Sequence, residues 1–213
     1  MTSPRRITLF HSPNTRSTGA LTLLEELDVP YALHVLNMKA GEQRQPAYLA
    51  VNPLGKVPAL MDGDTLVTEQ VAIFIHLADL FPQAGLAPLT GDPRRGAYLR
   101  WLVYYAACYE PALVDRFLDR KPAEPMHTPY SDFDAMLGVL EAQLAKGPYL
   151  LGDTISAADV LWGVALGWGM AFGMVPQRPV FAEYAARISA RPAATRVAER
   201  DAVLAAEHDA AIR

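Results

Sequence analysis

A short polar loop between two apolar segments carries the side chains best suited to chemistry. Residues 11–19, HSPNTRSTG, follow the β-branched and aromatic run 7–10 and precede the apolar helical pattern ALTLLEELD. The start of a helix presents unpaired N–H groups and a partial positive charge, so it stabilises an anion, a thiolate included. The loop contains neither cysteine nor tyrosine. Its hydrogen-bonding side chains are Ser12, Asn14, Thr15, Arg16 and Ser17.

A second candidate site is the stretch 52–60, NPLGKVPAL, followed by Glu69 and Gln70 at the start of another apolar helical pattern. The stretch opens on an Asn-Pro pair, which predicts a turn, and its glycine allows a backbone conformation closed to other residues. Because proline has no N–H, Pro58 leaves backbone groups of Val57 free to pair with a ligand. The bond between them is a candidate cis peptide, since X-Pro bonds adopt that form most readily in tight turns.

These segments resemble the glutathione-binding half of the cytosolic glutathione S-transferases, in a bacterial form similar to the theta and serine types. The resemblance is carried by NPLGKVPAL, by the DGD turn at 62–64 and by TEQVAIFIHL at 68–77. It implies that Val57 pairs with the cysteinyl backbone of glutathione. It also implies that Glu69 and Gln70 hold the γ-glutamyl ammonium and carboxylate. Gln70 departs from the serine or threonine usual in that family.

The resemblance implies that the polar loop activates the glutathione thiol. A free thiol with a pKa of about 8.5 is mostly protonated at neutral pH, and each unit of pKa corresponds to about 1.4 kcal/mol. Asn14 and Ser17 stand where related redox proteins carry the two cysteines of a C-x-x-C pair. At the first of these two positions, here Asn14, serine-type transferases have a hydroxyl that donates to the glutathione sulfur. An amide can also donate to a thiolate. Asn14 is therefore the first candidate catalytic residue, followed by Thr15, Ser17 and Ser12.

The same loop side chains are also typical of helix caps, which is their structural alternative. His11 is expected to make local hydrogen bonds, since thiol activation of this kind needs no general base. Two cations complete the expected glutathione site. Arg44 stands where theta-like relatives have a cation that reaches the glycyl carboxylate, and Lys56 lies close to the same turn. Both also fit ordinary exposed charges.

The expected electrophile pocket is read from one helical pattern. Aromatic residues at helical spacing are usually core, but an apolar wall with a few hydroxyls would suit a hydrophobic electrophile. The candidate residues fall on neighbouring turns: Tyr104, Tyr105, Cys108 and Tyr109.

The apolar patterning predicts an α/β thioredoxin-like domain followed by an all-helical domain. Strand, helix, strand, helix, strand, strand, helix is the expected order over residues 1–81, with helices on both faces of a small mixed sheet. A linker over 82–91 is rich in Pro and Gly, and 92–213 forms the helical domain. Its first helix spans 93–118 with a kink at Pro111, and a second spans 133–144.

Ser156 and Asp159 have the spacing of a capping box ahead of an apolar run. The pair also resembles the buried capping motif in the second domain of glutathione S-transferases. Asp159 is accordingly interpreted as a structural carboxylate rather than a catalytic one.

Composition narrows the class of protein. The chain has 213 residues, of which 51% are hydrophobic and 20% charged, as in globular proteins. A formal net charge of -4 and a pI near 5.7 argue against nucleic acid or an anionic membrane as partners. The single cysteine excludes an internal disulfide and fits a reducing, cytoplasmic compartment.

The predicted function is a glutathione S-transferase of the detoxification type, with glutathione as co-substrate, a small hydrophobic electrophile as second substrate, and no metal. The resemblance also implies a homodimer. A glutathione-dependent isomerase, lyase or disulfide reductase on the same fold is an alternative. A non-catalytic binding protein with this fold is another.

Overall fold

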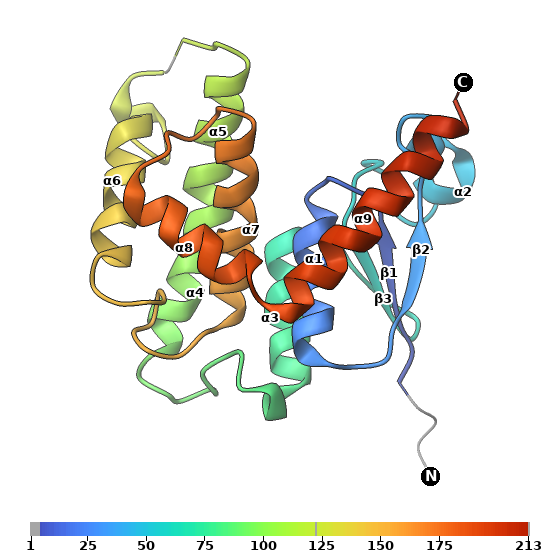
Figure 1. The fold of residues 1–213 in the computed structure, drawn as a ribbon, viewed down its shortest axis with the longest axis horizontal. Helices are drawn as coiled ribbons and strands as arrows, with labels where there is room; N and C mark the ends of the chain where they lie inside the picture. Colours follow the sequence, from blue (N-terminus) through green and yellow to red (C-terminus); the bar gives the residue numbers. More distant parts are fainter. Residues whose placement is uncertain (1–4, 122, 213) are drawn as a thin grey trace. The chain divides into compact units, whose positions relative to one another are not determined.

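The computed structural model describes residues 5–121 and 123–212, which divide into two compact units (Figure 1). One unit consists of the described residues up to Ala84 together with those from Arg191 onward. The other unit is Gly85–Ala190. The chain therefore completes its second unit and then returns to the first.

The first unit is built on a four-stranded mixed sheet with the strand order β2-β1-β3-β4. β1 pairs in parallel with β2 and antiparallel with β3, and β3 and β4 form the hairpin predicted around the DGD turn. The sheet and its helices confirm the expected thioredoxin-like fold. The strands are β1 (Ile7–His11), β2 (Ala32–Val35), β3 (Ala59–Asp62) and β4 (Thr65–Val67), and the helices before the linker are α1 (Ser17–Leu27), α2 (Pro46–Leu49) and α3 (Gln70–Leu80).

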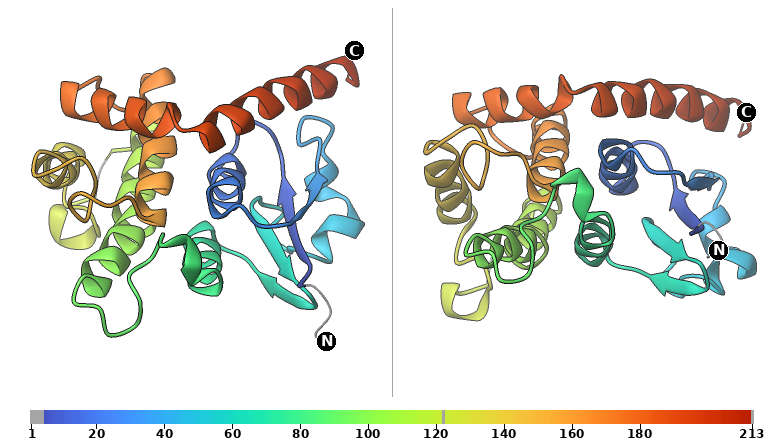
Figure 2. Two further views of the ribbon diagram at one scale, coloured as in Figure 1. Left: turned by 60° about the horizontal axis from the view of Figure 1, so that its bottom comes forward. Right: turned by 90° about the horizontal axis from the view of Figure 1, so that it is seen from below.

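The last helix, α9 (Pro192–Ala210), also belongs to this unit and packs beside α1 (Figures 1 and 2). Ion pairs join the two helices: Arg191 donates to both carboxylate oxygens of Glu26 at 2.7 Å, and Arg196 donates to Glu25 at 2.9 Å. The helical pattern predicts one domain over 92–213. The structure separates α9 from that range, because an amphipathic pattern does not state which unit its apolar stripe contacts.

The second unit is helical in its described residues. It contains α4 (Arg95–Tyr104), a π-helical turn (Tyr105–Tyr109), α5 (Glu110–Phe117), α6 (Phe133–Leu144), α7 (Ala157–Ala171) and α8 (Pro179–Ser189), with a short 3-10 turn at Pro125–His127. The predicted single helix over 93–118 is thus interrupted. Pro111 cannot donate to the helical ladder, and the wider turn closes just before it, with the Glu110 N–H bonded to the Tyr105 carbonyl.

The predicted capping box at the start of α7 is confirmed. Asp159 is fully buried and accepts four hydrogen bonds, two on each carboxylate oxygen. The donors are Leu150 N at 2.7 Å and the hydroxyl of Tyr184 at 2.8 Å on Oδ1, and Ser156 N and Oγ, both at 2.8 Å, on Oδ2. The carboxylate therefore ties α8 and the turn before α7 to the start of that helix. None of the helices in the described residues is long and apolar enough to cross a membrane.

Candidate functional site

The turn that precedes β3 is fixed by two side chains that hold one carbonyl group. The hydroxyl of Tyr48 donates to the Lys56 carbonyl at 2.6 Å, and the Asn52 amide donates to the same oxygen at 2.9 Å. Burial raises the pKa of Tyr48 to about 12, so its hydroxyl remains a donor at neutral pH. The peptide leading into Val57 is thereby held from the side of the core.

The backbone of Val57 is available for a ligand. Val57-Pro58 is a cis peptide, as proposed from the sequence, and β3 begins only at Ala59. Within the parts of the chain that the structure describes, neither the N–H nor the C=O of Val57 makes a hydrogen bond. A buried side chain beneath an unpaired backbone is the arrangement that lets a peptide ligand add to the edge of a turn.

Glu69 stands at the start of α3 with a φ of 67°, an uncommon conformation for a residue with a side chain. Such backbone strain is concentrated at functional sites. The Glu69 carboxylate is exposed and has no hydrogen-bond partner among the described residues. It is therefore open to a cationic group of a ligand.

Gln70 connects α3 to the polar loop. Its Nε2 donates to the Arg16 carbonyl at 2.9 Å, a reach that serine or threonine does not have. Its Oε1 is buried and has no hydrogen-bond partner in the described structure. Glutamine in place of serine or threonine thus adds a contact between α3 and the loop and leaves one buried acceptor without a partner in the described structure. A buried polar atom is usually hydrogen-bonded, so Oε1 is open to a donor from a ligand.

The two candidate cations differ in their contacts. Arg44 is the last residue of the 3-10 turn Glu42–Arg44 and donates to the Leu54 carbonyl at 3.3 Å, so its guanidinium lies at the 52–56 turn. Lys56 is exposed, and no contact of its ammonium is seen in the described part of the chain. Lys56 thus belongs to the turn that leads into Val57, and Arg44 reaches that turn with its side chain.

The polar loop is organised around Ser17, whose hydroxyl is buried. It lies 2.9 Å from Nδ1 of His11 and 2.7 Å from the hydroxyl of Thr15, and it accepts from the Ser12 N–H at 3.1 Å. Thr15 in turn donates to the Ser12 carbonyl at 2.8 Å. These two hydroxyl groups are committed to the internal structure of the loop.

Two of the four catalytic candidates keep uncommitted side chains. Asn14 is exposed at a φ of 56°, and its side-chain amide makes no hydrogen bond within the described ranges. Asparagine is one of the residues that adopt this left-handed conformation most readily. The hydroxyl of Ser12 likewise has no partner among the described residues. Asn14 and Ser12 are therefore the donors that remain for a ligand.

One residue that organises this loop was not identified from the sequence. Asp201 of α9 is 3% exposed and contacts His11, Asn14 and Thr18. Burial alone would raise the pKa of its carboxyl, but the hydrogen bonds from His11, Thr18 and Asn14 outweigh burial and leave the pKa below its ordinary value. The expectation that His11 makes local hydrogen bonds holds, although its second partner is 190 positions away in the chain.

The expected electrophile residues lie in the second unit, and two of them are core. Tyr105 and Tyr109 are buried and stack on one another with ring centroids 5.5 Å apart, and both contact the ring of Trp162. Tyr104 donates to the Met136 carbonyl at 3.0 Å. Cys108 is half-buried, and burial raises the pKa of its thiol although Arg100 offsets part of the effect. Its sulfur is thus a weak nucleophile at neutral pH.

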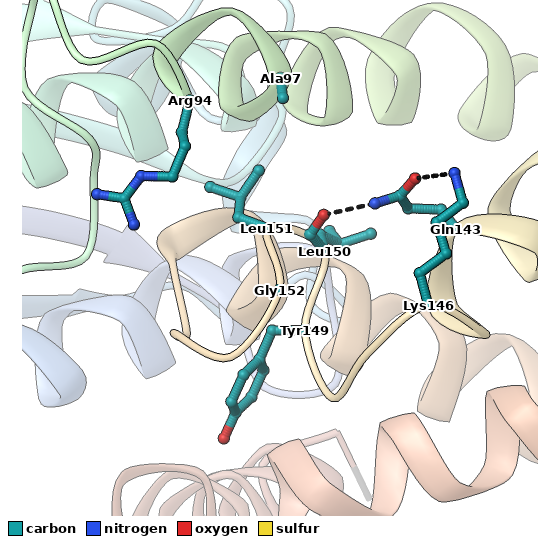
Figure 3. Close-up of a pocket in the computed structure, with 8 residues that line it drawn as sticks. All are labelled: Arg94, Ala97, Gln143, Lys146, Tyr149, Leu150, Leu151 and Gly152. Atoms are coloured by element: carbon teal, nitrogen blue, oxygen red, sulfur yellow. Dashed lines mark hydrogen bonds between the residues drawn. The ribbon is translucent and has the colours of Figure 1, made fainter.

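A surface pocket of about 330 Å³ is found elsewhere in the second unit (Figure 3). Gln143 lines the pocket and its side-chain amide donates to the Leu150 carbonyl at 2.8 Å, while the Lys146 ammonium donates to the Gln143 side-chain oxygen at 3.3 Å. None of the four expected electrophile residues lines this pocket. Its lining is Arg94, Ala97, Gln143, Lys146, Tyr149, Leu150, Leu151 and Gly152. Within the described chain no three His, Cys, Asp or Glu side chains are grouped as a metal site would require.

Comparison with known proteins relates both units to one family. Residues 5–79 match the family described as glutathione S-transferase, N-terminal domain, and residues 130–187 match glutathione S-transferase, C-terminal domain. Glutathione S-transferase F10 of Arabidopsis thaliana is 34% identical over 165 residues, which cover 72% of this chain and 76% of that protein.

Solved structures give the same result. A glutathione transferase from Methylococcus capsulatus superposes with a TM-score of 0.79 at 28% identity, covering 92% of this chain and 99% of the other. A glutathione transferase homologue from Sulfitobacter, solved with bound glutathione, has a TM-score of 0.75 at 27% identity over 92% of this chain and 98% of its own. The chain belongs to the cytosolic glutathione S-transferase family.

Proposed function

We propose that this glutathione S-transferase binds glutathione on its thioredoxin-like unit, along the Val57 backbone and the start of α3. The observation that supports this most directly is the unpaired backbone of Val57 next to the cis bond to Pro58. Two backbone hydrogen bonds at that edge would hold the cysteinyl residue of glutathione. The thiol would then be placed by a main-chain contact that does not depend on the residue type at position 57.

The two ends of glutathione require different groups. Its γ-glutamyl end carries an ammonium, which would pair with the exposed carboxylate of Glu69. It also carries a carboxylate, which would accept from the second N–H of the Gln70 amide, since the first donates to the Arg16 carbonyl. Its glycyl carboxylate would be met by Lys56, on the turn that leads into Val57, or by Arg44, whose side chain reaches that turn. A charged group at each end of a zwitterionic tripeptide fixes its direction along the site.

The thiol would be activated by hydrogen bonding and by the dipole of α1, with Asn14 as the leading donor and Ser12 as the second. Ser17 and Thr15 would act through the shape of the loop, since the Ser17 hydroxyl accepts from the Ser12 N–H and the Thr15 hydroxyl donates to the Ser12 carbonyl. In the reaction the thiolate sulfur forms a bond to an electrophilic carbon, and a leaving group departs or a proton is added from solvent. The enzyme then contributes positioning and thiolate stabilisation.

The proposed activation is tested by ultraviolet titration of the thiolate band in the enzyme–glutathione complex. We expect a thiol pKa below that of free glutathione, and we expect Asn14→Ala to raise it and to slow conjugation roughly tenfold to a hundredfold, which is the loss typical of one such donor. Ser12→Ala gives the matched comparison. The assignment to Asn14 fails if its variant keeps the thiolate band and the rate while the Ser12 variant loses both. The activation itself fails if bound glutathione titrates as it does in water.

The electrophile is proposed to be small and hydrophobic, in keeping with detoxification. A screen of aryl halides, epoxides, enals and mixed disulfides separates conjugation from isomerase, lyase and disulfide reductase activity on the same site. Turnover of mixed disulfides alone would replace the transferase assignment by a reductase one. Binding of glutathione without turnover of any class would favour a binding protein.

We further propose a cytoplasmic homodimer. A free, half-buried cysteine fits a reducing compartment, and two-fold dimers are the commonest soluble assembly. Light scattering at micromolar concentration should give twice the chain mass of 23.3 kDa. A measured mass equal to that of the single chain would reject the dimer.

A further inference from the structure

The last helix presents a carboxylate where its sequence pattern calls for an apolar side chain. The buried residues of α9 are Ala193, Val197 and Asp201, which recur every four positions and so lie on one face of the helix. This face packs on α1, beside which α9 runs in all views (Figures 1 and 2). A buried carboxylate is costly unless it is hydrogen-bonded, so the partners of Asp201 explain its presence.

The partners of Asp201 are concentrated on the polar loop. Its Oδ1 lies 2.9 Å from Nε2 of His11, which is itself buried. Its Oδ2 accepts from the Asn14 N–H at 3.1 Å and from the hydroxyl of Thr18 at 2.6 Å. Two of the three contacts therefore hold residues 11 and 14, at the two sides of Ser12, and the third docks α9 on α1.

His11 extends the same contact into the loop. A ring nitrogen that faces a carboxylate carries the proton, so Asp201 assigns the N–H to Nε2 and leaves Nδ1 as an acceptor in the neutral ring. Nδ1 lies 2.9 Å from the hydroxyl of Ser17, which can donate to it while accepting from the Ser12 N–H at 3.1 Å. The chain of contacts thus runs from Asp201 through His11 and Ser17 to the backbone of Ser12.

We propose that Asp201 and His11 are positioning residues for thiol activation: from the last helix they fix the main chain at Ser12 and Asn14, and so aim the two uncommitted donors before glutathione binds. The inference rests on the proposed activation by this loop. It extends the activating site from the first helix to the C-terminal helix. Neither residue touches the substrate in this proposal, and neither transfers a proton.

The sign of the expected effect separates positioning from simple electrostatics. A negative charge near a thiolate opposes its formation, so removing the charge of Asp201 would lower the pKa of the bound thiol if only the charge mattered. If the carboxylate acts by holding the loop, its loss raises that pKa. The charged or titratable groups that act on Asp201 are His11 from β1 and Arg200 from its own helix.

The experiment is the ultraviolet titration of bound glutathione in Asp201→Asn, which keeps the volume of the side chain. An amide nitrogen then faces either His11 or the Asn14 N–H, so one loop contact is lost or reversed in either orientation. We expect the pKa of the bound thiol to rise by about one unit and kcat at pH 6.5 to fall about tenfold. The rate should recover as the pH is raised past the new pKa. The glutathione Kd from calorimetry should change less than about threefold, since Val57 and Glu69 remain in place.

Two controls accompany this variant. Glu199→Gln changes the net charge of α9 by the same amount at an exposed position and should leave the thiol pKa unchanged. Thr18→Val removes only the docking contact of Asp201 and should lower thermal stability without moving the thiol pKa. A pKa shift in Thr18→Val as large as in Asp201→Asn would reduce the effect to helix docking and overturn the proposal.

A further variant keeps the proposal testable if Asp201→Asn does not fold. His11→Gln can place an amide N–H opposite Asp201 but removes the acceptor for Ser17, and it should raise the thiol pKa by a smaller amount. An unchanged or lowered thiol pKa in whichever of the two variants folds would overturn the positioning role. If wild-type protein already binds glutathione with the pKa of the free thiol, the proposed activation fails. If the pKa of the bound thiol lies equally far below that of free glutathione in the wild type and in the variants, the activation stands and only the positioning role of Asp201 and His11 fails.

Discussion

The buried carboxylate of Asp159 offers a test of the distinction between a structural and a catalytic acid. In Asp159→Asn, one carboxylate oxygen becomes an amide nitrogen, and each oxygen accepts one main-chain N–H and one hydroxyl. The hydroxyl of Tyr184 or Ser156 can turn to accept from the amide, but the N–H of Leu150 or Ser156 is left facing another donor. One buried N–H is therefore stranded in either orientation.

The magnitude follows from these contacts. A stranded buried N–H costs about 1 to 3 kcal/mol, and the three remaining bonds lose the strength that a charged acceptor gives them. Burial raises the pKa of the Asp159 carboxyl despite its hydrogen bonds, which means that the buried charge is itself costly. Replacing the charged carboxylate by a neutral amide removes part of that cost and so reduces the net loss of stability. We take about 2 to 4 kcal/mol as the net loss. For a chain of this size that corresponds to a fall in Tm of roughly 4 to 16 °C.

The assay is thermal unfolding followed by circular dichroism at pH 7 and fixed protein concentration, because a dimer would make Tm depend on concentration. Asp153→Asn is the matched control: this carboxylate is exposed in the turn before α7 and should change stability by no more than about 0.5 kcal/mol. The pKa of bound glutathione should be the same in both variants. The structural role of Asp159 is refuted if Asp159→Asn has the same Tm as Asp153→Asn. It is also refuted if Asp159→Asn keeps the wild-type Tm but loses the thiolate band of bound glutathione.

Two further predictions concern ligand binding and helix packing. Glu69→Ala should weaken glutathione binding by about 1.5 to 3 kcal/mol in calorimetry, because the carboxylate pairs with the ammonium of the ligand. Asp64→Ala, at an exposed position in the preceding turn, should leave the affinity unchanged. Equal affinities in the wild type and both variants would remove Glu69 from the site. In a urea titration, Gly163→Ala should destabilise the protein by about 1 to 3 kcal/mol, because the added Cβ would lie 2.4 to 2.7 Å from side-chain atoms of Ile188. Gly138→Ala has open space at the added Cβ and should be neutral or stabilising in the same titration.

Local patterns predict the elements of this fold with good accuracy where one physical signal dominates. The helix predicted over 133–144 has the bounds of α6, because Asp132 caps its start and its apolar spacing is regular. The hairpin around DGD and the cis bond at Pro58 are likewise confirmed, since each depends on a few adjacent residues. Glycine and proline restrict the backbone locally, so their effect is readable without knowledge of the rest of the chain.

The interruption of the long helix shows where local reading stops. Pro111 is a visible signal for a break, but the π-helical turn before it rotates the following residues relative to a regular helix. Tyr105 and Tyr109, the first and last residues of that turn, stack in the core with Trp162, while Tyr104 and Cys108 contact residues of α6 and the loop before it. Helical spacing groups the four residues, but it does not state which of them face the core.

The polar loop gives the clearest case of information that only the folded chain contains. The sequence offers four neutral donors between residues 12 and 17 with nothing to rank them except the resemblance. In the structure Ser17 and Thr15 bond to one another and to Ser12, which leaves Asn14 and the Ser12 hydroxyl available. The main chain of the same loop is bonded to Asp201, which the sequence shows as a carboxylate on the apolar stripe of a helix. Its meaning depends on which unit that helix packs against, and that is seen only in the folded chain, where α9 lies on α1 and pairs with Glu25 and Glu26.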